Sequence, residues 1–162
     1  MAKSVAEQLL FFQRFSSYIV VLKMGIQNYV IATRFITTIC HFTALIMVWE
    51  LKQATIEVHL GDTYSKERKD SIEMEIDSAL AFGLLCFLWD FASIIFGNSL
   101  FINSSNYFQI LCHFVGGLLL SWFILNKWHQ SILWPIILST NFLTAMSEIL
   151  VNIGLFRLKS FA

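Results

Sequence analysis

Charged residues divide this chain into long apolar runs. Residues 35–49 carry no charge, Asp90 is the only charged residue in 78–126, and Glu148 is the only one in 128–156. A helix needs about 20 residues, at about 1.5 Å each, to cross the apolar core of a bilayer. The third run is therefore long enough for one membrane span and the middle run for two, and the first run reaches the length of a span when residues 31–34 are included.

The pattern predicts four membrane-spanning helices, at about 31–49, 78–97, 107–126 and 132–156. The stretch GNSLFINSSN separates the second span from the third, because Gly, Asn and Ser favour tight turns. The stretch NKWHQS separates the third span from the fourth. Short connections make neighbouring helices antiparallel. We therefore expect an all-α membrane protein, a four-transmembrane-helix antiparallel bundle whose tetraspan domain covers 31–162.

Composition supports a membrane protein. The chain is 57% hydrophobic and 14% charged, with a mean hydropathy of +0.67, whereas soluble domains are about 25% charged. The formal net charge is zero, so no basic field attracts nucleic acid, and membrane lipids are the expected surroundings. Cys40, Cys86 and Cys112 all fall inside apolar runs, which favours small residues packed in the core over a disulfide framework.

The segments outside the spans predict the topology. Residues 1–30 carry Arg14 and Lys23 within an apolar stretch, so we expect an N-terminal extension that forms an amphipathic helix on the membrane surface and not a fifth span. Lys and Arg number six on the side of the termini and five on the other, which favours both termini cytosolic. The loop 50–77 is then extracytosolic. There the alternation in ATIEVHL is typical of a short strand, and Ser65 is the expected N-cap of a polar helix leading into the second span.

Each predicted span carries one ionisable residue. Counted from the cytosolic end of its span, each lies about 9 to 14 Å deep, so the four form one layer. Ionisable residues at this depth are costly and mark either a functional site or a buried pair. The layer consists of His41, Asp90, His113 and Glu148.

Small and polar residues share the helical faces of these four. Helices in lipid associate through close backbone approach at small residues and through hydrogen bonds, so these faces are expected to point inward. The supporting face consists of Ser93, Gly97, Gln109, Gly117, Asn141, Thr144 and Asn152.

Three interpretations of the layer compete. The favoured one is structural, with each acid paired or protonated and the bundle held in register. The alternative is a small ion or proton channel or transporter that uses the layer as its path. A metal site is the third interpretation, but no two of the four layer residues have the spacing of three or four residues that is typical of helical metal sites, and the two cysteines that precede the histidines point about 100° away from them. The chain also contains no Gly-rich phosphate loop, nucleophile elbow or HExxH motif. We therefore expect no metal, no cofactor and no catalytic residue.

The chain resembles the transmembrane protein 107 family from Arg34 to near its end. The resemblance rests on RFITTICHF, on GDTYSKE in the loop, on Asp90, and on FGNSLFINSS in the turn. It continues with His113 and LSWFILNKW in the third span, and with SEI and GLFRLK in the fourth. Two departures are that residues 1–33 precede the family pattern and that Asp90 stands where the family has a glutamate.

The resemblance implies a non-enzymatic tetraspan protein with both termini cytosolic. It implies a structural subunit of the ciliary transition zone, in the Meckel syndrome module that forms the membrane gate at the cilium base. Expected partners are tectonic-type proteins, B9-domain proteins and other transition-zone membrane proteins.

Overall fold

The computed structural model describes the backbone of residues 2–60, 65–97, 99–100 and 102–160, and the side chains of 25–58, 60, 65–97, 99–100 and 102–154. Over this part of the chain every regular element is a helix. The elements are α1 (Ala2–Glu50), α2 (Lys52–Leu60), α3 (Lys66–Phe96), α4 (Asn103–Leu125), the 3₁₀ turn η1 (Gln130–Ile132), α5 (Leu133–Ile137), the π turn η2 (Leu138–Phe142) and α6 (Leu143–Ser160).

Four helical segments are long and apolar enough to cross a membrane. They are Gly25–Glu50, Lys66–Phe96, Asn103–Leu125 and Gln130–Gly154. The prediction of an all-α four-helix bundle is confirmed. The fourth span consists of four consecutive elements, from η1 to α6, and the π turn within it was not foreseen.

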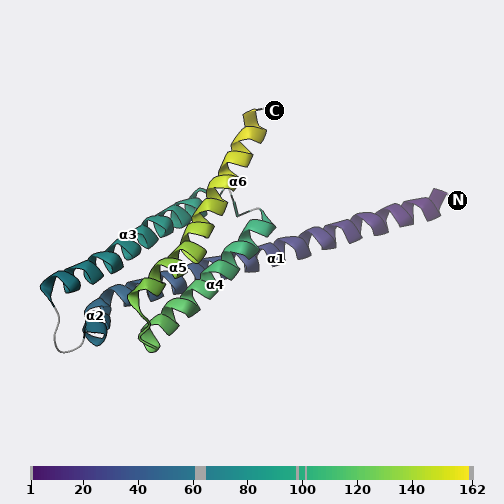
Figure 1. Ribbon diagram of the computed structural model, residues 1–162. Helices are drawn as coiled ribbons and strands as arrows, with labels where there is room; N and C mark the ends of the chain where they lie inside the picture. Colours follow the sequence, from purple (N-terminus) through teal and green to yellow (C-terminus); the bar gives the residue numbers. More distant parts are fainter. Residues whose placement is uncertain (1, 61–64, 98, 101, 161–162) are drawn as a thin grey trace.

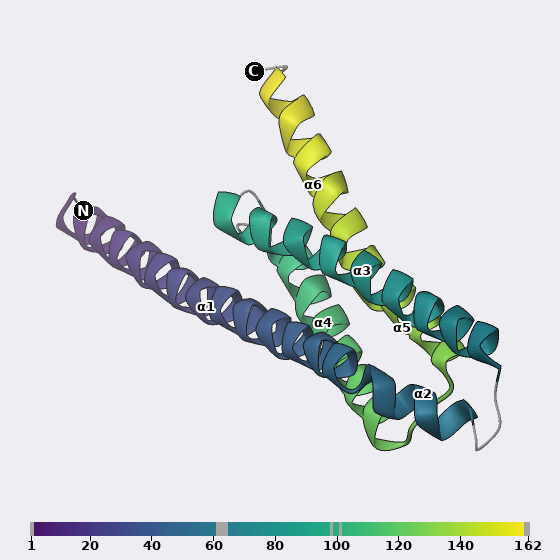
Figure 2. The same ribbon diagram turned by 90° about the vertical axis from the view of Figure 1, so that its left-hand side faces the viewer.

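The spans pack side by side, and the two termini extend beyond the same end of the bundle (Figures 1 and 2). The short helix α2 lies at the opposite end, beside the junction between α4 and α5 in both views. This arrangement is the one expected for an even number of spans. The assignment of the shared end to the cytosol stays a prediction.

The segment between the first two spans differs from the expectation. The predicted strand in ATIEVHL is wrong, because these residues belong to the helix α2. Ile56 on α2 is fully buried, so a helical face packs this segment against the bundle. Ser65 caps α3 as expected, since its side chain accepts a hydrogen bond from the Arg68 backbone N–H at 3.3 Å. The polar residues after it continue into the second span as one helix.

The third span begins earlier than expected. Helix α4 starts at Asn103, four residues before the predicted boundary at 107. The preceding turn begins at Gly97, which ends α3 in the left-handed region at φ 73°. Glycine adopts this conformation without steric cost. Gly97 therefore terminates α3 and is half-buried there, and its place on a helix-packing face stays a prediction.

The N-terminal extension is helical along its backbone and continues into the first span without a break at residue 30 (Figure 1). The side chains of residues 2–24 lie outside the described part. The amphipathic character and membrane-surface position of the extension stay predictions.

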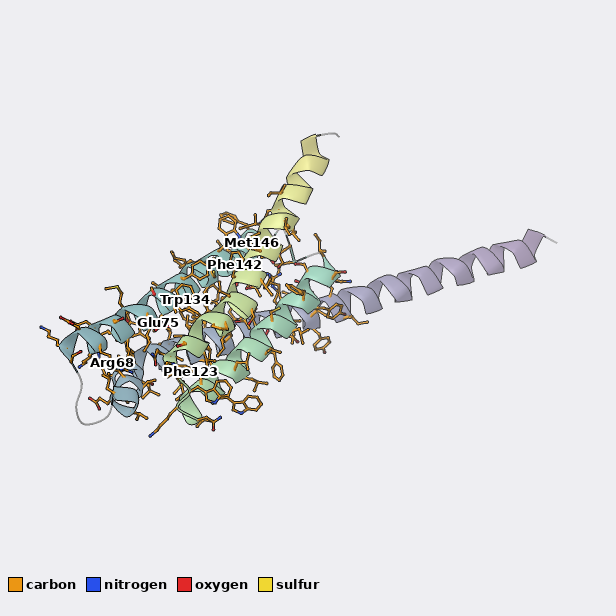
Figure 3. The ribbon with its side chains drawn as sticks, viewed as in Figure 1. Arg68, Glu75, Phe123, Trp134, Phe142 and Met146 are labelled. Carbon is orange, nitrogen blue, oxygen red and sulfur yellow. The ribbon has the colours of Figure 1, made fainter. Side chains whose placement is uncertain are left out.

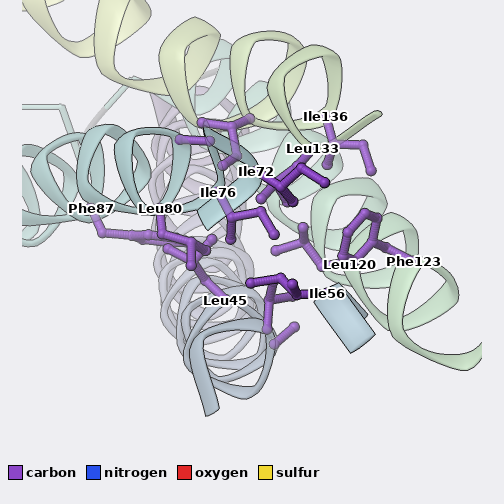
Figure 4. Packing of buried hydrophobic residues seen from close by; sticks show 14 residues of the cluster. Leu45, Ile56, Ile72, Ile76, Leu80, Phe87, Leu120, Phe123, Leu133 and Ile136 are labelled. Carbon is purple, nitrogen blue, oxygen red and sulfur yellow. The ribbon is translucent and has the colours of Figure 1, made fainter. Parts of the chain in front are cut away.

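An apolar core occupies the half of the bundle nearer α2 (Figure 4). Buried side chains from α1, α2, α3, α4 and α5 meet there, and Phe87, Leu80 and Phe123 are almost fully enclosed. At the edge of this core, Phe82 of α3 lies 5.9 Å from the Trp134 ring and 6.0 Å from the Phe142 ring, measured between centroids. Trp134 and Phe142 lie along the fourth span in Figure 3, whereas Arg68 and Glu75 mark the polar start of α3.

Candidate functional site: a buried polar network

A buried ion pair joins the first span to the last. Arg34 of α1 donates from Nη2 to Glu148 Oε1 of α6 at 2.7 Å. The two side chains are 1% and 0% exposed. Burial removes both charges from solvent, so their mutual attraction is not screened and must offset their loss of hydration.

Two further spans contribute donors to Glu148. Gln109 Nε2 of α4 donates to Oε1 at 3.0 Å, and the Ser93 hydroxyl of α3 donates to Oε2. All four spans therefore meet at this one carboxylate. The prediction that Glu148, Ser93 and Gln109 face inward together is consistent with this geometry.

The guanidinium of Arg34 also holds the connection between α3 and α4. Its Nη1 donates to Ser99 Oγ at 3.0 Å and to Asn106 Oδ1 at 2.8 Å. Asn106 in turn donates to the Leu100 carbonyl at 2.7 Å. Arg34 directly precedes the uncharged run 35–49, and it was not among the residues predicted to form the polar layer. Its spacing of four and seven residues from Thr38 and His41 places it on the same helical face, which was the available signal.

The two histidines and Asp90 form a second, adjacent cluster. His41 Nδ1 lies 3.1 Å from His113 Nδ1, and His113 Nε2 lies 3.6 Å from Asp90 Oδ2. Thr144 donates to the same Asp90 oxygen at 2.9 Å. At 3.1 Å one histidine Nδ1 donates to the other, whereas the 3.6 Å contact between His113 and Asp90 is longer than a hydrogen bond. The cluster therefore links α1 to α4 through the two imidazoles, and links α3 to α6 through Asp90 and Thr144.

A glycine makes room for the His41 ring. A Cβ on Gly116 would lie 2.3 Å from His41 Cε1 and 2.5 Å from Nε2, whereas a Cβ on Gly117 would meet the His41 Cα at 3.5 Å. The ring thus lies directly on the α4 backbone at Gly116. Sequence reasoning named Gly117 for this face. The structure shows that Gly117 is near α1 but that Gly116 is the position where no side chain fits.

The other predicted members of the face differ in their roles. Asn141 is fully buried in the π turn η2, where its Oδ1 accepts from the Thr140 hydroxyl at 3.1 Å. Its backbone carbonyl accepts from Thr144 at 2.8 Å. Asn152 lies one turn beyond Glu148 and is half-buried. The π turn ends two residues before Thr144, the donor to Asp90, and π turns recur at functional sites.

The network contains no set of metal ligands. Among the residues that the structure describes, no group of three or more His, Cys, Asp or Glu side chains is placed to hold an ion. Cys86 is buried, Cys112 is half-buried and Cys40 is exposed on the outer face. The prediction that all three cysteines pack inside is therefore wrong for Cys40.

Comparison with known proteins identifies the family. The family model for TMEM107, described as a transmembrane protein, matches residues 30–152. The chain belongs to the transmembrane protein 107 family. The human transmembrane protein 107 is 26% identical over 136 residues, which cover 84% of this chain and 97% of the human protein. The mouse protein is 24% identical over the same shares of both chains. The Xenopus laevis protein is 23% identical over 126 residues, or 78% of this chain and 90% of its own length.

The family resemblance seen in the sequence is confirmed, and the protein is a multi-pass transmembrane protein of this family. The matched region contains every described side chain of the two polar clusters. No solved structure matches the chain.

Proposed function

We propose that this protein is a non-enzymatic structural subunit of the ciliary transition zone, located in the ciliary membrane there. It supports assembly of the Meckel syndrome module and of the gate that controls ciliary membrane protein composition. The proposal rests on membership of the transmembrane protein 107 family. Its partners are transition-zone membrane proteins of the tectonic type, B9-domain proteins and other members of the module.

The observation that carries a structural role is the convergence of all four spans on Glu148. A carboxylate that accepts hydrogen bonds from Arg34, Gln109 and Ser93 fixes the relative position of four helices. Buried polar groups of this kind specify helix register in a membrane, where apolar faces alone discriminate poorly. A rigid bundle of fixed outer shape is what an assembly subunit presents to its neighbours.

Fluorescent fusions in ciliated cells test this role. The wild-type fusion should form a ring at the cilium base and co-purify with B9-domain and tectonic-type proteins. Thr144→Val removes a buried hydroxyl that donates to Asp90, and should lower both signals. Thr43→Val is the matched control, because the Thr43 hydroxyl is exposed and bonds only to its own helix at the Ile39 carbonyl. A stable fusion that is absent from the cilium base would contradict the proposal.

A channel or transporter is the second candidate. Within the described part of the chain, buried polar atoms of the network lack a hydrogen-bond partner, among them Asp90 Oδ1, His41 Nε2 and Asn141 Nδ2. Such atoms favour bound water, which an ion or proton path requires. Purified protein in liposomes distinguishes the two functions. Proton or cation flux that Glu148→Gln abolishes would favour transport, and the absence of flux with an intact bundle would favour the structural role.

A further inference from the structure

An open groove of about 490 Å³ lies between α2 and the end of α4. Its volume falls within the range of about 300–1,000 Å³ that is typical of small-molecule sites. Apolar side chains form most of its surface, and a carboxylate and an ammonium group complete it. The main lining residues are Leu51, Val58, Ile124, Glu57 and Lys127.

The groove lies where the apolar part of the bundle ends. Lys52, the first residue of α2, places its Nζ 2.8 Å from Asp77 Oδ1 and 3.1 Å from Glu73 Oε1, so charged groups gather at this level. The ring of Trp49 lies beneath the same ammonium group at 5.9 Å, and tryptophan favours the boundary between lipid and water. The groove therefore opens at the depth of phospholipid headgroups.

The two charged groups of the groove are opposite in sign and unpaired with each other. Glu57 and Lys127 are both exposed, and none of the ion pairs within the described residues joins them. An anion and a cation that are not paired with each other on one apolar surface complement a molecule that carries both charges next to hydrocarbon.

The backbone at Lys127 adds a second observation. Its φ is 48°, in the left-handed region, and the Trp128 N–H closes the helix end by donating to the Phe123 carbonyl at 3.1 Å. Glycine is the usual residue at this position of a helix C-terminus, because a side chain is disfavoured there. A lysine in this conformation is a local cost to folding that a ligand contact would offset.

We propose that this groove binds the headgroup of a zwitterionic phospholipid. The Lys127 ammonium group binds the phosphate, the Glu57 carboxylate binds the lipid ammonium group, and Leu51, Val58 and Ile124 contact the glycerol and the upper acyl chain. An anionic phospholipid would satisfy Lys127 but would leave Glu57 unpaired. The site goes beyond the proposed function and does not depend on it.

Native mass spectrometry of the full chain in detergent tests the site. Phosphatidylethanolamine and phosphatidylglycerol with identical acyl chains are added in equal amounts, and the wild type should retain the zwitterionic lipid preferentially. Glu57→Gln should lower this preference by about fivefold. Lys127→Gly should lower retention of both lipids by a similar factor while relieving the backbone at φ 48°. An unchanged lipid preference in Glu57→Gln, or unchanged retention in Lys127→Gly, would overturn the proposal.

Exposed charges away from the groove provide the controls. Asp70→Asn and Lys66→Gln remove one acid and one base from the exposed start of α3. Neither should change lipid retention. Equal effects from these variants would mean that the net charge of the protein selects the lipid, and would also overturn the proposal.

Photo-crosslinking identifies the occupant in a bilayer. A photoreactive amino acid replaces Val58, which is 49% exposed and lines the groove. Illumination in liposomes of phosphatidylethanolamine and phosphatidylglycerol should give an adduct with the mass of phosphatidylethanolamine. A covalent dimer, or an adduct only with phosphatidylglycerol, would show that another occupant fills the groove.

Discussion

Replacement of Arg34 by methionine tests the energetic role of the central ion pair. The change removes the 2.7 Å contact with Glu148 and leaves a fully buried carboxylate beside the hydroxyl of Ser93 and the amide of Gln109. Removing one partner of a buried pair costs about 3–5 kcal/mol, because the other charge stays uncompensated. We expect Arg34→Met to lower the free energy of unfolding by that amount.

A double variant at Arg34 and Glu148 separates the energetic contribution of the ion pair from the cost of changing the two side chains. Arg34→Met combined with Glu148→Met removes both charges and leaves only neutral groups without partners. Its cost should be at least about 2 kcal/mol smaller than the sum of the two single costs. Lys52→Met is the contrasting control. Lys52 is 15% exposed and its partner Asp77 is 41% exposed, so this pair should contribute at most about 1 kcal/mol.

Unfolding can be followed through the thiol of Cys86. This residue is 7% exposed in the folded bundle, so a thiol-reactive dye should label it only after unfolding. Cys40→Ser and Cys112→Ser remove the other two thiols from the background. SDS titration of each variant in mixed micelles then gives its free energy of unfolding. A cost below about 1 kcal/mol for Arg34→Met, or additive single costs, would refute a buried and coupled ion pair.

Three further predictions follow from the helix ends and the helix contacts. Gly116→Ala forces a Cβ to 2.3 Å from the His41 ring and should lower the free energy of unfolding by about 1–3 kcal/mol. Gly117→Ala, with its nearest contact at 3.5 Å, should lower it clearly less. The same SDS titration measures both variants, and equal costs would contradict the close packing. Ser65→Ala removes the N-cap of α3 and should cost about 1 kcal/mol in that assay, while Ser65→Gly should cost only a few tenths. The hydrogen bond to Asp77 raises the pKa of Lys52. The stabilisation of the folded protein by the Lys52 ammonium group is therefore complete below the unfolded pKa of about 10.4 and is lost as pH rises through the folded pKa. Raising the pH above about 10 should destabilise the wild type more than it destabilises Lys52→Met.

The number of spans and their inward faces could be predicted because the bilayer requires long apolar helices and disfavours charged groups that face lipid. A segment without charge for about 20 residues has few alternatives to a spanning helix, and a costly residue such as Asp90 must point inward. This reasoning brought Ser93, Gln109, Thr144 and Glu148 to one site, where the structure also places them.

Arg34 and the segment after Glu50 could not be predicted in the same way. Arg34 lies at a span boundary, where an arginine can equally reach water, and only the fold brings Glu148 close enough to bury it. The alternation in residues 54–60 suits a strand, yet the segment is helical and buries Ile56 against the bundle. The π turn at 138–142 could not be predicted, because the hydrophobic pattern of the sequence does not distinguish a π turn from an ordinary α-helical turn.

The separation of Arg34 and Glu148 along the chain has a consequence during synthesis. The two residues are 114 positions apart, so at about 5–20 residues per second the ribosome needs roughly 6–23 s to supply the acid after the base. Throughout that interval the first span enters the membrane with an arginine whose counter-charge has not yet been made. The last span therefore supplies the charge that neutralises Arg34 in the first span. A truncated chain that ends before Glu148 keeps Arg34 within the membrane without its carboxylate partner.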